Sequence, residues 1–151
     1  MSAPRQQGRK ARLVALAAVS SLALSSCVGN FDPNNPRQIS ASERQSGAQA
    51  HPQILAEFGG AYDGPGTDMV QRVGKQVSVA SGLATTGEEC TVTLLDSQVV
   101  NAFAIPGCYT YVTRGLLAIM ENEAQLASVL GHEVGHVAAQ HSQRRQNAAL
   151  G

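Results

Sequence analysis

The sequence predicts an α+β fold in which amphipathic helices pack on a small β-sheet. Two segments, residues 67–80 and 122–137, carry apolar side chains at three- and four-residue steps, which is the pattern of core-facing helices. Between them, residues 91–113 are rich in β-branched and apolar residues and are interrupted by a Pro-Gly pair, which indicates short strands. With 151 residues, the chain is long enough for one domain.

The start of the chain has a pattern typical of an export signal. Four basic residues precede an apolar run at residues 13–24, which has the length of a signal-peptide core and is too short to span a bilayer. The run leads into Leu-Ser-Ser-Cys at residues 24–27, which resembles the lipobox of bacterial lipoproteins. We therefore expect residues 1–26 to be removed as a signal peptide and Cys27 to be lipidated. An ordinary secretory signal with an incidental Cys27 is the alternative.

A tether is predicted between this signal and the folded domain. Residues 27–39 combine the lipidated cysteine with Gly, Asn, Asp and two prolines, and the domain is expected at residues 40–151. The whole chain has 11 basic and 11 acidic residues, and removal of the signal would leave 7 basic against 11 acidic ones. No basic patch would remain to attract nucleic acid or anionic lipid, so the expected membrane link is the acyl chains.

Two cysteines remain after lipidation. Cys90 and Cys108 are an even number in an exported protein, a compartment that permits a disulfide. Two buried free thiols are the alternative, and the sequence does not decide between them.

The first helices are predicted from capping residues. Ser40 and Glu43 have the spacing of a capping box, which predicts a helix that begins next to Ser40. Pro52 then predicts a kink or a restart of that helix. Thr67 or Asp68 is expected to cap the next helix. The core-facing side chains of this second helix are Met69, Val70, Val73, Val77 and Ala80.

Strands and a long helix complete the predicted domain. The strands are expected within residues 91–95, 99–105 and 109–113. Asn122, with Gln125 three residues on, predicts the N-cap of the long helix. The apolar face of that helix consists of Leu126, Val129, Leu130, Val134 and Val137.

The long helix carries an H-E-x-x-H motif. Its members are His132, Glu133 and His136, with Val134 and Gly135 between. Four residues make about 400° of helix rotation, so the two imidazoles fall on one face about 6 Å apart along the axis. Neutral imidazoles bind zinc, and a carboxylate between them can take a proton from a water at the metal. The motif predicts a zinc metallopeptidase. A helix with two solvated histidines and a glutamate that match by chance is the alternative.

Several further motifs give the chain a family resemblance. They lie at residues 50–55, 94–97, 101–107, 111–117 and 130–137. Together they resemble metallopeptidase family forty-eight, the CAAX prenyl protease and HtpX-like group, in its bacterial periplasmic lipoprotein branch. The resemblance runs from about Ser40 to the C-terminus. It implies a zincin-like N-terminal part that includes the long zinc-binding helix.

The resemblance also implies roles for individual residues. His132 and His136 match the two zinc-binding histidines of the family, and Glu133 matches its catalytic glutamate, so one Zn²⁺ per chain is expected. The segment Asn101-Ala102-Phe103-Ala104 matches the strand that lies beside the zinc, whose backbone can pair with an extended substrate.

The third zinc ligand of the family is a glutamate on a helix well downstream of the motif. This chain stops at Gly151, 15 residues after His136. We therefore expect a C-terminally truncated domain that is itself inactive. His141 is half a turn out of phase with the first histidine of the motif and cannot substitute. Glu121 and Glu123 lie about 14–16 Å along the helix from the same histidine and are too far away.

The predicted function is that of a lipid-anchored zinc endopeptidase in the bacterial cell envelope. It is expected to face the periplasm at the outer membrane and to act on unfolded or misassembled envelope proteins, in protein quality control, with no nucleic-acid partner. A non-catalytic envelope lipoprotein or chaperone-like scaffold is the alternative, and the missing third ligand favours it.

Overall fold

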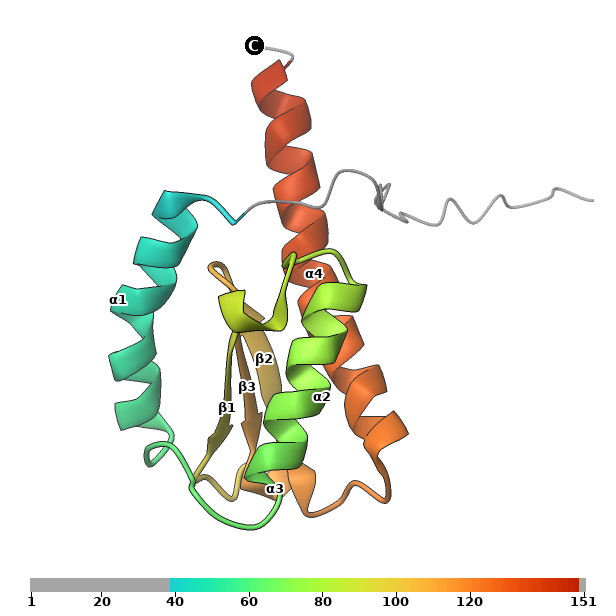
Figure 1. The fold of residues 1–151 in the computed structure, drawn as a ribbon. Helices are drawn as coiled ribbons and strands as arrows, with labels where there is room; N and C mark the ends of the chain where they lie inside the picture. The colour runs from blue at the N-terminus through green and yellow to red at the C-terminus, as the bar shows by residue number, and fades with distance from the viewer. Residues whose placement is uncertain (1–38, 150–151) are drawn as a thin grey trace, which may run out of the picture.

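Three layers make up the domain in the computed structural model. The model describes the backbone of residues 39–149 and the side chains of residues 39–138. A small sheet forms the middle layer, with α1 on one face and α2 and α4 on the other (Figure 1). The predicted combination of helices with a small sheet is confirmed. The predicted signal peptide, the lipidated Cys27 and the tether lie outside the described residues.

The sheet is mixed and has three strands. β1 (Thr91–Leu95), β2 (Ala102–Ile105) and β3 (Tyr109–Thr113) are arranged in the order β1-β3-β2. The central strand β3 runs parallel to β1 and antiparallel to β2. β2 therefore lies at one edge of the sheet.

β2 begins three residues later than the sequence predicts. Val99 and Val100 are 58% and 56% exposed and belong to the loop before the strand. This loop is held by the buried hydroxyl of Thr113, whose Oγ1 lies 2.5 Å from the carbonyl oxygen of Val99 and 2.9 Å from that of Asn101. The same Oγ1 accepts hydrogen bonds from the backbone N–H groups of Asn101 (3.0 Å) and Leu116 (3.3 Å). One side chain thus fixes the entry to the edge strand.

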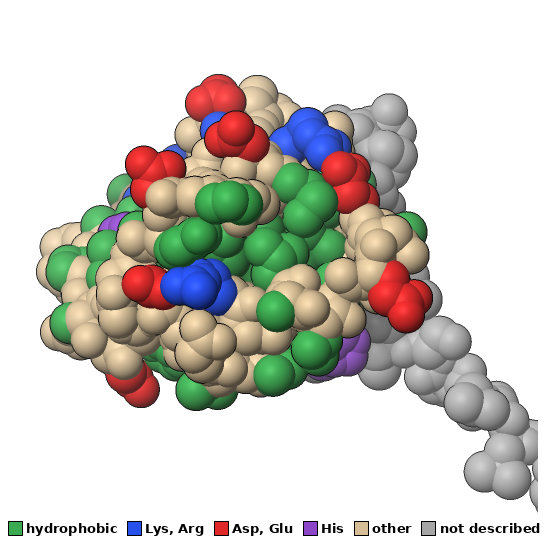
Figure 2. Space-filling model, turned by 90° about the horizontal axis from the view of Figure 1, so that it is seen from below, with side chains coloured by type: hydrophobic (Ala, Val, Ile, Leu, Met, Phe, Trp, Pro, Cys, Tyr) green, Lys and Arg blue, Asp and Glu red, His purple; other side chains and the backbone are tan. Residues whose placement is uncertain are grey.

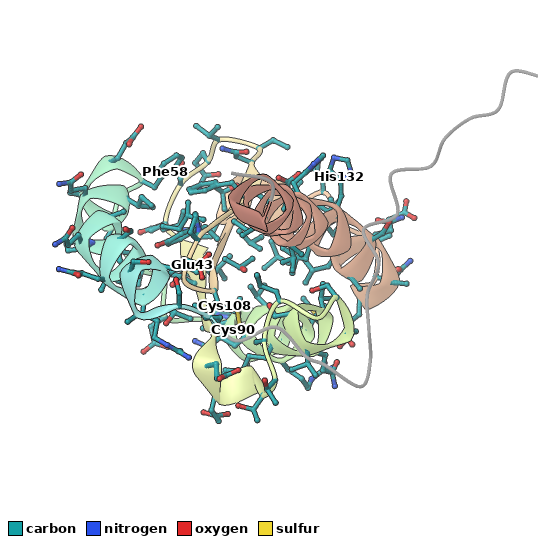
Figure 3. The ribbon with its side chains drawn as sticks, turned by 90° about the horizontal axis from the view of Figure 1, so that it is seen from above. Glu43, Phe58, Cys90, Cys108 and His132 are labelled. Carbon is teal, nitrogen blue, oxygen red and sulfur yellow. A yellow bond between two sulfur atoms is a disulfide. The ribbon has the colours of Figure 1, made fainter. Side chains whose placement is uncertain are left out.

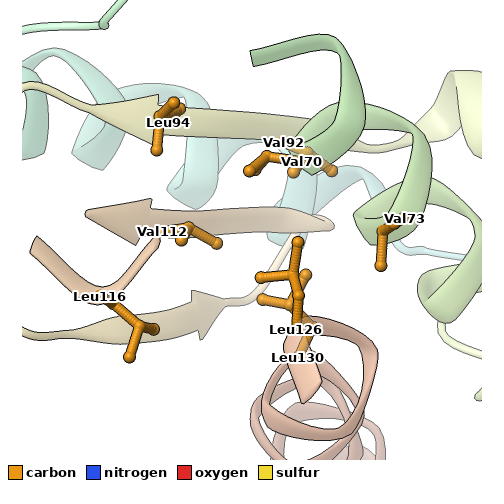
Figure 4. Close-up of a cluster of buried hydrophobic side chains, with 8 residues drawn as sticks. All are labelled: Val70, Val73, Val92, Leu94, Val112, Leu116, Leu126 and Leu130. Atoms are coloured by element: carbon orange, nitrogen blue, oxygen red, sulfur yellow. The ribbon is translucent and has the colours of Figure 1, made fainter. Parts of the chain in front are cut away.

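The main core lies between the sheet and the helices α2 (Thr67–Ala80) and α4 (Glu123–Ala149). Figure 4 shows its buried members, which are Val70, Val73, Val92, Leu94, Val112, Leu116, Leu126 and Leu130. Close packing of α2 on β1 requires glycine at position 74, because a Cβ there would come within 2.6 Å of Val92 Cγ1. The apolar stripes predicted for both helices face the sheet, except that Ala80, at the end of α2, is exposed.

The caps of these two helices differ in how well they were predicted. Asn122 Oδ1 accepts from the N–H of Gln125 at 3.0 Å, which confirms the predicted cap of α4. The predicted cap of α2 is wrong, because Gly66, with φ 93°, occupies the N-cap position and has no side chain to offer. Thr67 Oγ1 donates instead to the carbonyl oxygen of Tyr62 and accepts from the N–H of Gly64, which stabilises the preceding turn.

The helix α1 (Ala41–Glu57) covers the opposite face of the sheet. The predicted capping box is present, with Ser40 Oγ accepting from the N–H of Glu43 and the carboxylate of Glu43 accepting from the N–H of Ser40. The helix continues through Pro52, so the predicted restart does not occur. Gly47 lets α1 approach the sheet, since a Cβ there would lie 2.5 Å from the ring of Tyr109.

A disulfide joins Cys90 to Cys108 and decides the question that the sequence left open. Both cysteines are buried, in a second cluster with Ile39, Leu83, Ala84, Val134 and Val137. Cys108 has φ 65°, a left-handed conformation that non-glycine residues rarely adopt, and it follows Gly107 in the turn between β2 and β3.

The end of the molecule at α3 (Arg114–Leu117) has an apolar surface. Figure 2 shows hydrophobic side chains gathered there in a shallow hollow bordered by acidic and basic ones. Two loops at this end carry exposed apolar residues, Val99 and Val100 before β2 and Ile119 after α3. Within the described part of the chain, no helix combines the length and hydropathy needed to cross a membrane.

Candidate active site

The two histidines of the H-E-x-x-H motif lie side by side on α4. Their Nε2 atoms are 2.9 Å apart, and their rings are nearly perpendicular, at 88°, with centroids 4.4 Å apart. Both His132 and His136 are exposed, whereas Glu133 is half-buried. The geometry follows from helical periodicity, which places residues four apart on one face.

The spacing of these imidazoles suits a shared metal. Zinc–nitrogen bonds of about 2.0–2.1 Å in a tetrahedral site separate two nitrogen ligands by about 3.3 Å. The Nε2 atoms of His132 and His136 need to move apart by only a few tenths of an ångström to reach this separation. The pair therefore fits as two of the three protein ligands of a catalytic zinc.

A third protein ligand is not found among the described side chains. No group of three or more His, Cys, Asp or Glu residues in that part of the chain could hold a metal ion. Glu123 accepts a hydrogen bond from Arg72, and this bond and the charge of the guanidinium keep the pKa of Glu123 below its ordinary value. Glu121 accepts from the side-chain amide of Gln125. His141 lies on α4 beyond the residues whose side chains are described.

Apolar contacts hold the motif in position on the domain. Leu130 and Val134 are fully buried and Val137 is nearly so, which fixes one face of α4 on the sheet and the disulfide cluster. An adjacent stripe of α4 carries no side chain at two successive turns, because both positions are glycine; we call it the bare stripe. Gly131 and Gly135 each precede a histidine, and within the described structure a Cβ at either position would meet nothing within 4 Å.

Within the described residues, β2 pairs with β3 on one side and has no strand on the other, which is called the open edge of the sheet. Asn101 accepts a hydrogen bond from the N–H of Thr113, which sets the alternation of the antiparallel pair. Phe103, two residues on, directs its backbone groups to β3, so those of Ala102 and Ala104 face the open edge. Each of the two alanines exposes one N–H and one C=O to an incoming strand.

The side chains of β2 alternate between the faces of the sheet. Ala102 and Ala104 pack against the core clusters on the α2 and α4 side, where their small size lets α4 come close. Phe103 points to the α1 side and stacks on Tyr111, with ring centroids 4.9 Å apart. The predicted segment from Asn101 to Ala104 therefore lies beside α4, as an edge strand.

An aromatic group on the α1 face was not predicted as part of a site. Four of the six aromatic residues of the chain gather there: Phe58, Phe103, Tyr109 and Tyr111. His51 Nδ1 lies 2.9 Å from the hydroxyl of Tyr111, and burial raises the pKa of Tyr111 to about 12. The two tyrosines are two residues apart in one predicted strand, and this spacing was the available signal that they share a face of the sheet. Only the fold shows that Phe103 and Phe58 join them.

Comparison with known proteins decides the family. The sequence profile of peptidase family M48 matches residues 66–151, more than half of the chain. The chain belongs to peptidase family M48. The match contains α2, the whole sheet and the H-E-x-x-H helix, whereas α1 precedes it.

Two curated relatives of this M48 chain are both named mitochondrial metalloendopeptidase OMA1. The protein of Schizosaccharomyces pombe is 33% identical over 104 residues, which cover 66% of this chain and 30% of the relative. The protein of Arabidopsis thaliana is 42% identical over 50 residues, which cover 33% of this chain and 10% of the relative. The chain thus spans less than a third of the length of each.

These relatives correct the predicted location of the M48 chain. A bacterial cell envelope, with a lipid anchor facing the periplasm, is contradicted by two relatives that are mitochondrial enzymes of a yeast and a plant. The prediction rested on a basic, acid-free start, an apolar run and the lipobox-like Leu-Ser-Ser-Cys at residues 24–27. Mitochondrial transit peptides are also rich in Arg and Ser and poor in acidic residues, so the basic start did not distinguish the two locations. The HtpX-like lipoprotein branch is likewise unsupported, although the family itself is confirmed.

Proposed function

We propose that the chain carries the catalytic helix and the substrate-binding edge of a zinc-dependent metalloendopeptidase. The observation that carries the proposal is the 2.9 Å separation of His132 Nε2 and His136 Nε2 on the helix that also bears Glu133. When bound, zinc supplies Lewis acidity toward water and toward the scissile carbonyl oxygen. His132 and His136 would hold the ion.

Glu133 is proposed as the group that moves the proton. Its carboxylate takes a proton from the attacking water as the new C–O bond forms at the scissile carbon. The carboxylic acid then gives that proton to the amide nitrogen as the C–N bond breaks, so Glu133 returns to its starting state.

The edge of β2 is proposed to orient the substrate. The backbone groups of Ala102 and Ala104 can pair with an extended polypeptide, in the way that peptides add to the edges of sheets. A segment whose backbone is not already paired in a helix or sheet can adopt this extended form, so unfolded or locally unfolded polypeptides are the proposed substrates.

A polypeptide-binding scaffold without catalysis is the second candidate. It is favoured by the absence of a three-ligand metal group from the described residues. The edge strand would then bind polypeptides, and no bond would be broken.

The complete natural protein that contains these residues is the right material for the test, because this chain spans 30% of the yeast relative. Glu133→Gln should lower peptide hydrolysis by about a hundredfold or more and leave bound zinc unchanged, since the residue is a base and not a ligand. Glu121→Gln, a carboxylate change before the same helix, is the control and should retain activity. Peptide binding without cleavage by the zinc-loaded wild type would favour the scaffold instead.

A further inference from the structure

The aromatic residues on the α1 face form a column that ends at the edge strand. Tyr111 is fully buried at its inner end, and Phe103 stacks on it at 4.9 Å between centroids. Phe58, at the C-cap of α1, lies 5.4 Å from Phe103 at the outer end. Both phenylalanines are partly exposed. The column therefore presents an apolar surface where β2 is open.

An extended polypeptide on β2 must place some side chains against this surface. Side chains of a strand alternate between the two faces of a sheet, and directly opposite residues share a face. The backbone of Phe103 is bonded to β3, so in an antiparallel partner the residue opposite Phe103 occupies a non-hydrogen-bonded pair, the type with the closest side chains. That residue packs beside the ring of Phe103, within reach of Phe58.

We propose that Phe58 and Phe103 form a specificity subsite for a large apolar side chain of the polypeptide that pairs with β2. The subsite lies on the face of the sheet opposite the two histidines. Figure 3 shows Phe58 on the α1 side and His132 on the α4 side of the strands. The inference rests on the proposed edge-strand function and adds a preference at one substrate position.

The two halves of this subsite have different origins in the chain. Phe103 lies within residues 66–151, the part matched by the family profile, whereas Phe58 precedes it. α1 is seated by Gly47 against Tyr109 and by His51 against Tyr111. The helix therefore brings to the edge strand an aromatic residue that the matched part of the chain does not contain.

Peptide binding to the Glu133→Gln variant of the complete protein tests the subsite without cleavage and without added metal. The probes are extended peptides of Thr and Ala with a single varied position, occupied by Phe, Leu, Ser or Asp, and the readout is the Kd from fluorescence anisotropy. The Phe and Leu peptides should bind about fivefold more tightly than the Ser peptide, as expected for one cross-strand apolar pair.

Variants at Phe58 separate a role in specificity from a role in folding. Phe58→Ala should reduce the preference for Phe over Ser to less than about twofold. Phe58→Arg should create a preference for the Asp peptide, a gain that loss of structure does not produce. Val79→Ala, an exposed apolar change on α2, is the matched control and should keep the original preference. Phe103→Ala is less suitable, because it also removes the contact with buried Tyr111.

Each outcome distinguishes this inference from the proposed function. Peptides that bind with the same preference in the parent, Phe58→Ala and Phe58→Arg proteins, all with native circular dichroism, would refute the subsite alone. Failure of every peptide to bind would refute the edge-strand function and the subsite together.

Discussion

Cys90 and Cys108 are joined by a disulfide that lies in the same buried cluster as Val134 and Val137 of the motif-bearing helix. The bridge closes a loop between residues 18 apart in the sequence and fixes β1 to the β2–β3 turn beneath α4. Cys90→Ala should lower the free energy of unfolding by about 3 kcal/mol, mainly because the unfolded chain gains freedom. Urea unfolding followed by circular dichroism measures the change, and a loss below about 1 kcal/mol would contradict it.

The left-handed backbone of Cys108 allows a matched comparison. The double variant Cys90→Ala/Cys108→Gly should be more stable than Cys90→Ala/Cys108→Ala by about 1 kcal/mol, because glycine adopts φ 65° without steric cost. Both variants lack the disulfide, so their difference isolates the backbone effect. Equal unfolding midpoints would show that the turn relaxes once the bridge is removed.

Zinc binding by this chain should depend on the paired imidazoles. The two Nε2 atoms lie 2.9 Å apart and supply only two ligands, so we expect weak zinc binding in competition with a colorimetric chelator. His132→Ala or His136→Ala should weaken that binding by about tenfold or more. His51→Ala is the control, since its Nδ1 is engaged with Tyr111 on the other side of the sheet. Unchanged affinity in His132→Ala would place the metal elsewhere.

Two threonines of β3 should respond differently to the same substitution. Thr113→Val removes the hydroxyl that bonds Asn101 and Leu116 and should lower stability by about 1–3 kcal/mol. Thr110 is as deeply buried, and its Oγ1 has no hydrogen-bond partner among the described residues. Thr110→Val should therefore be neutral or stabilising. Similar losses from both variants, measured by thermal unfolding, would contradict the assignment.

Tyr111 should make the domain sensitive to alkali. Burial raises its pKa to about 12 from the ordinary value of 10.0, so the folded state favours the neutral phenol. This contribution to stability is complete below pH 10 and is lost as the pH rises through about 12. Tyr111→Phe should lose about 1 kcal/mol at pH 7 with the His51 contact, yet show a weaker decline above pH 10 in urea unfolding. If the stability of Tyr111→Phe declined above pH 10 as steeply as that of the parent, the decline would come from the ionisation of other groups.

The structural predictions that were confirmed came mainly from patterns between residues close together in the sequence. The capping box at Ser40 and Glu43, the cap at Asn122 and the pairing of His132 with His136 depend on residues three or four apart. Contacts between distant segments were not accessible in this way. The parallel pairing of β1 with β3 and the tilted ring contact between Phe58 and Phe103 are set by tertiary packing. Gly66 replaced the expected cap because the turn required a left-handed residue.

The bare stripe at Gly131 and Gly135 has a consequence for the strength of any chemistry on α4. Bulk water reaches the helix there, as far as the described chain defines its surroundings, and water screens charge. Two unit charges 4 Å apart interact by about 1 kcal/mol in water but by about 4 kcal/mol at an effective dielectric constant of 20. Exclusion of water from this stripe, for example by a bound substrate, would lower the local dielectric constant and strengthen the action of Glu133 and the two imidazoles on a polarised bond.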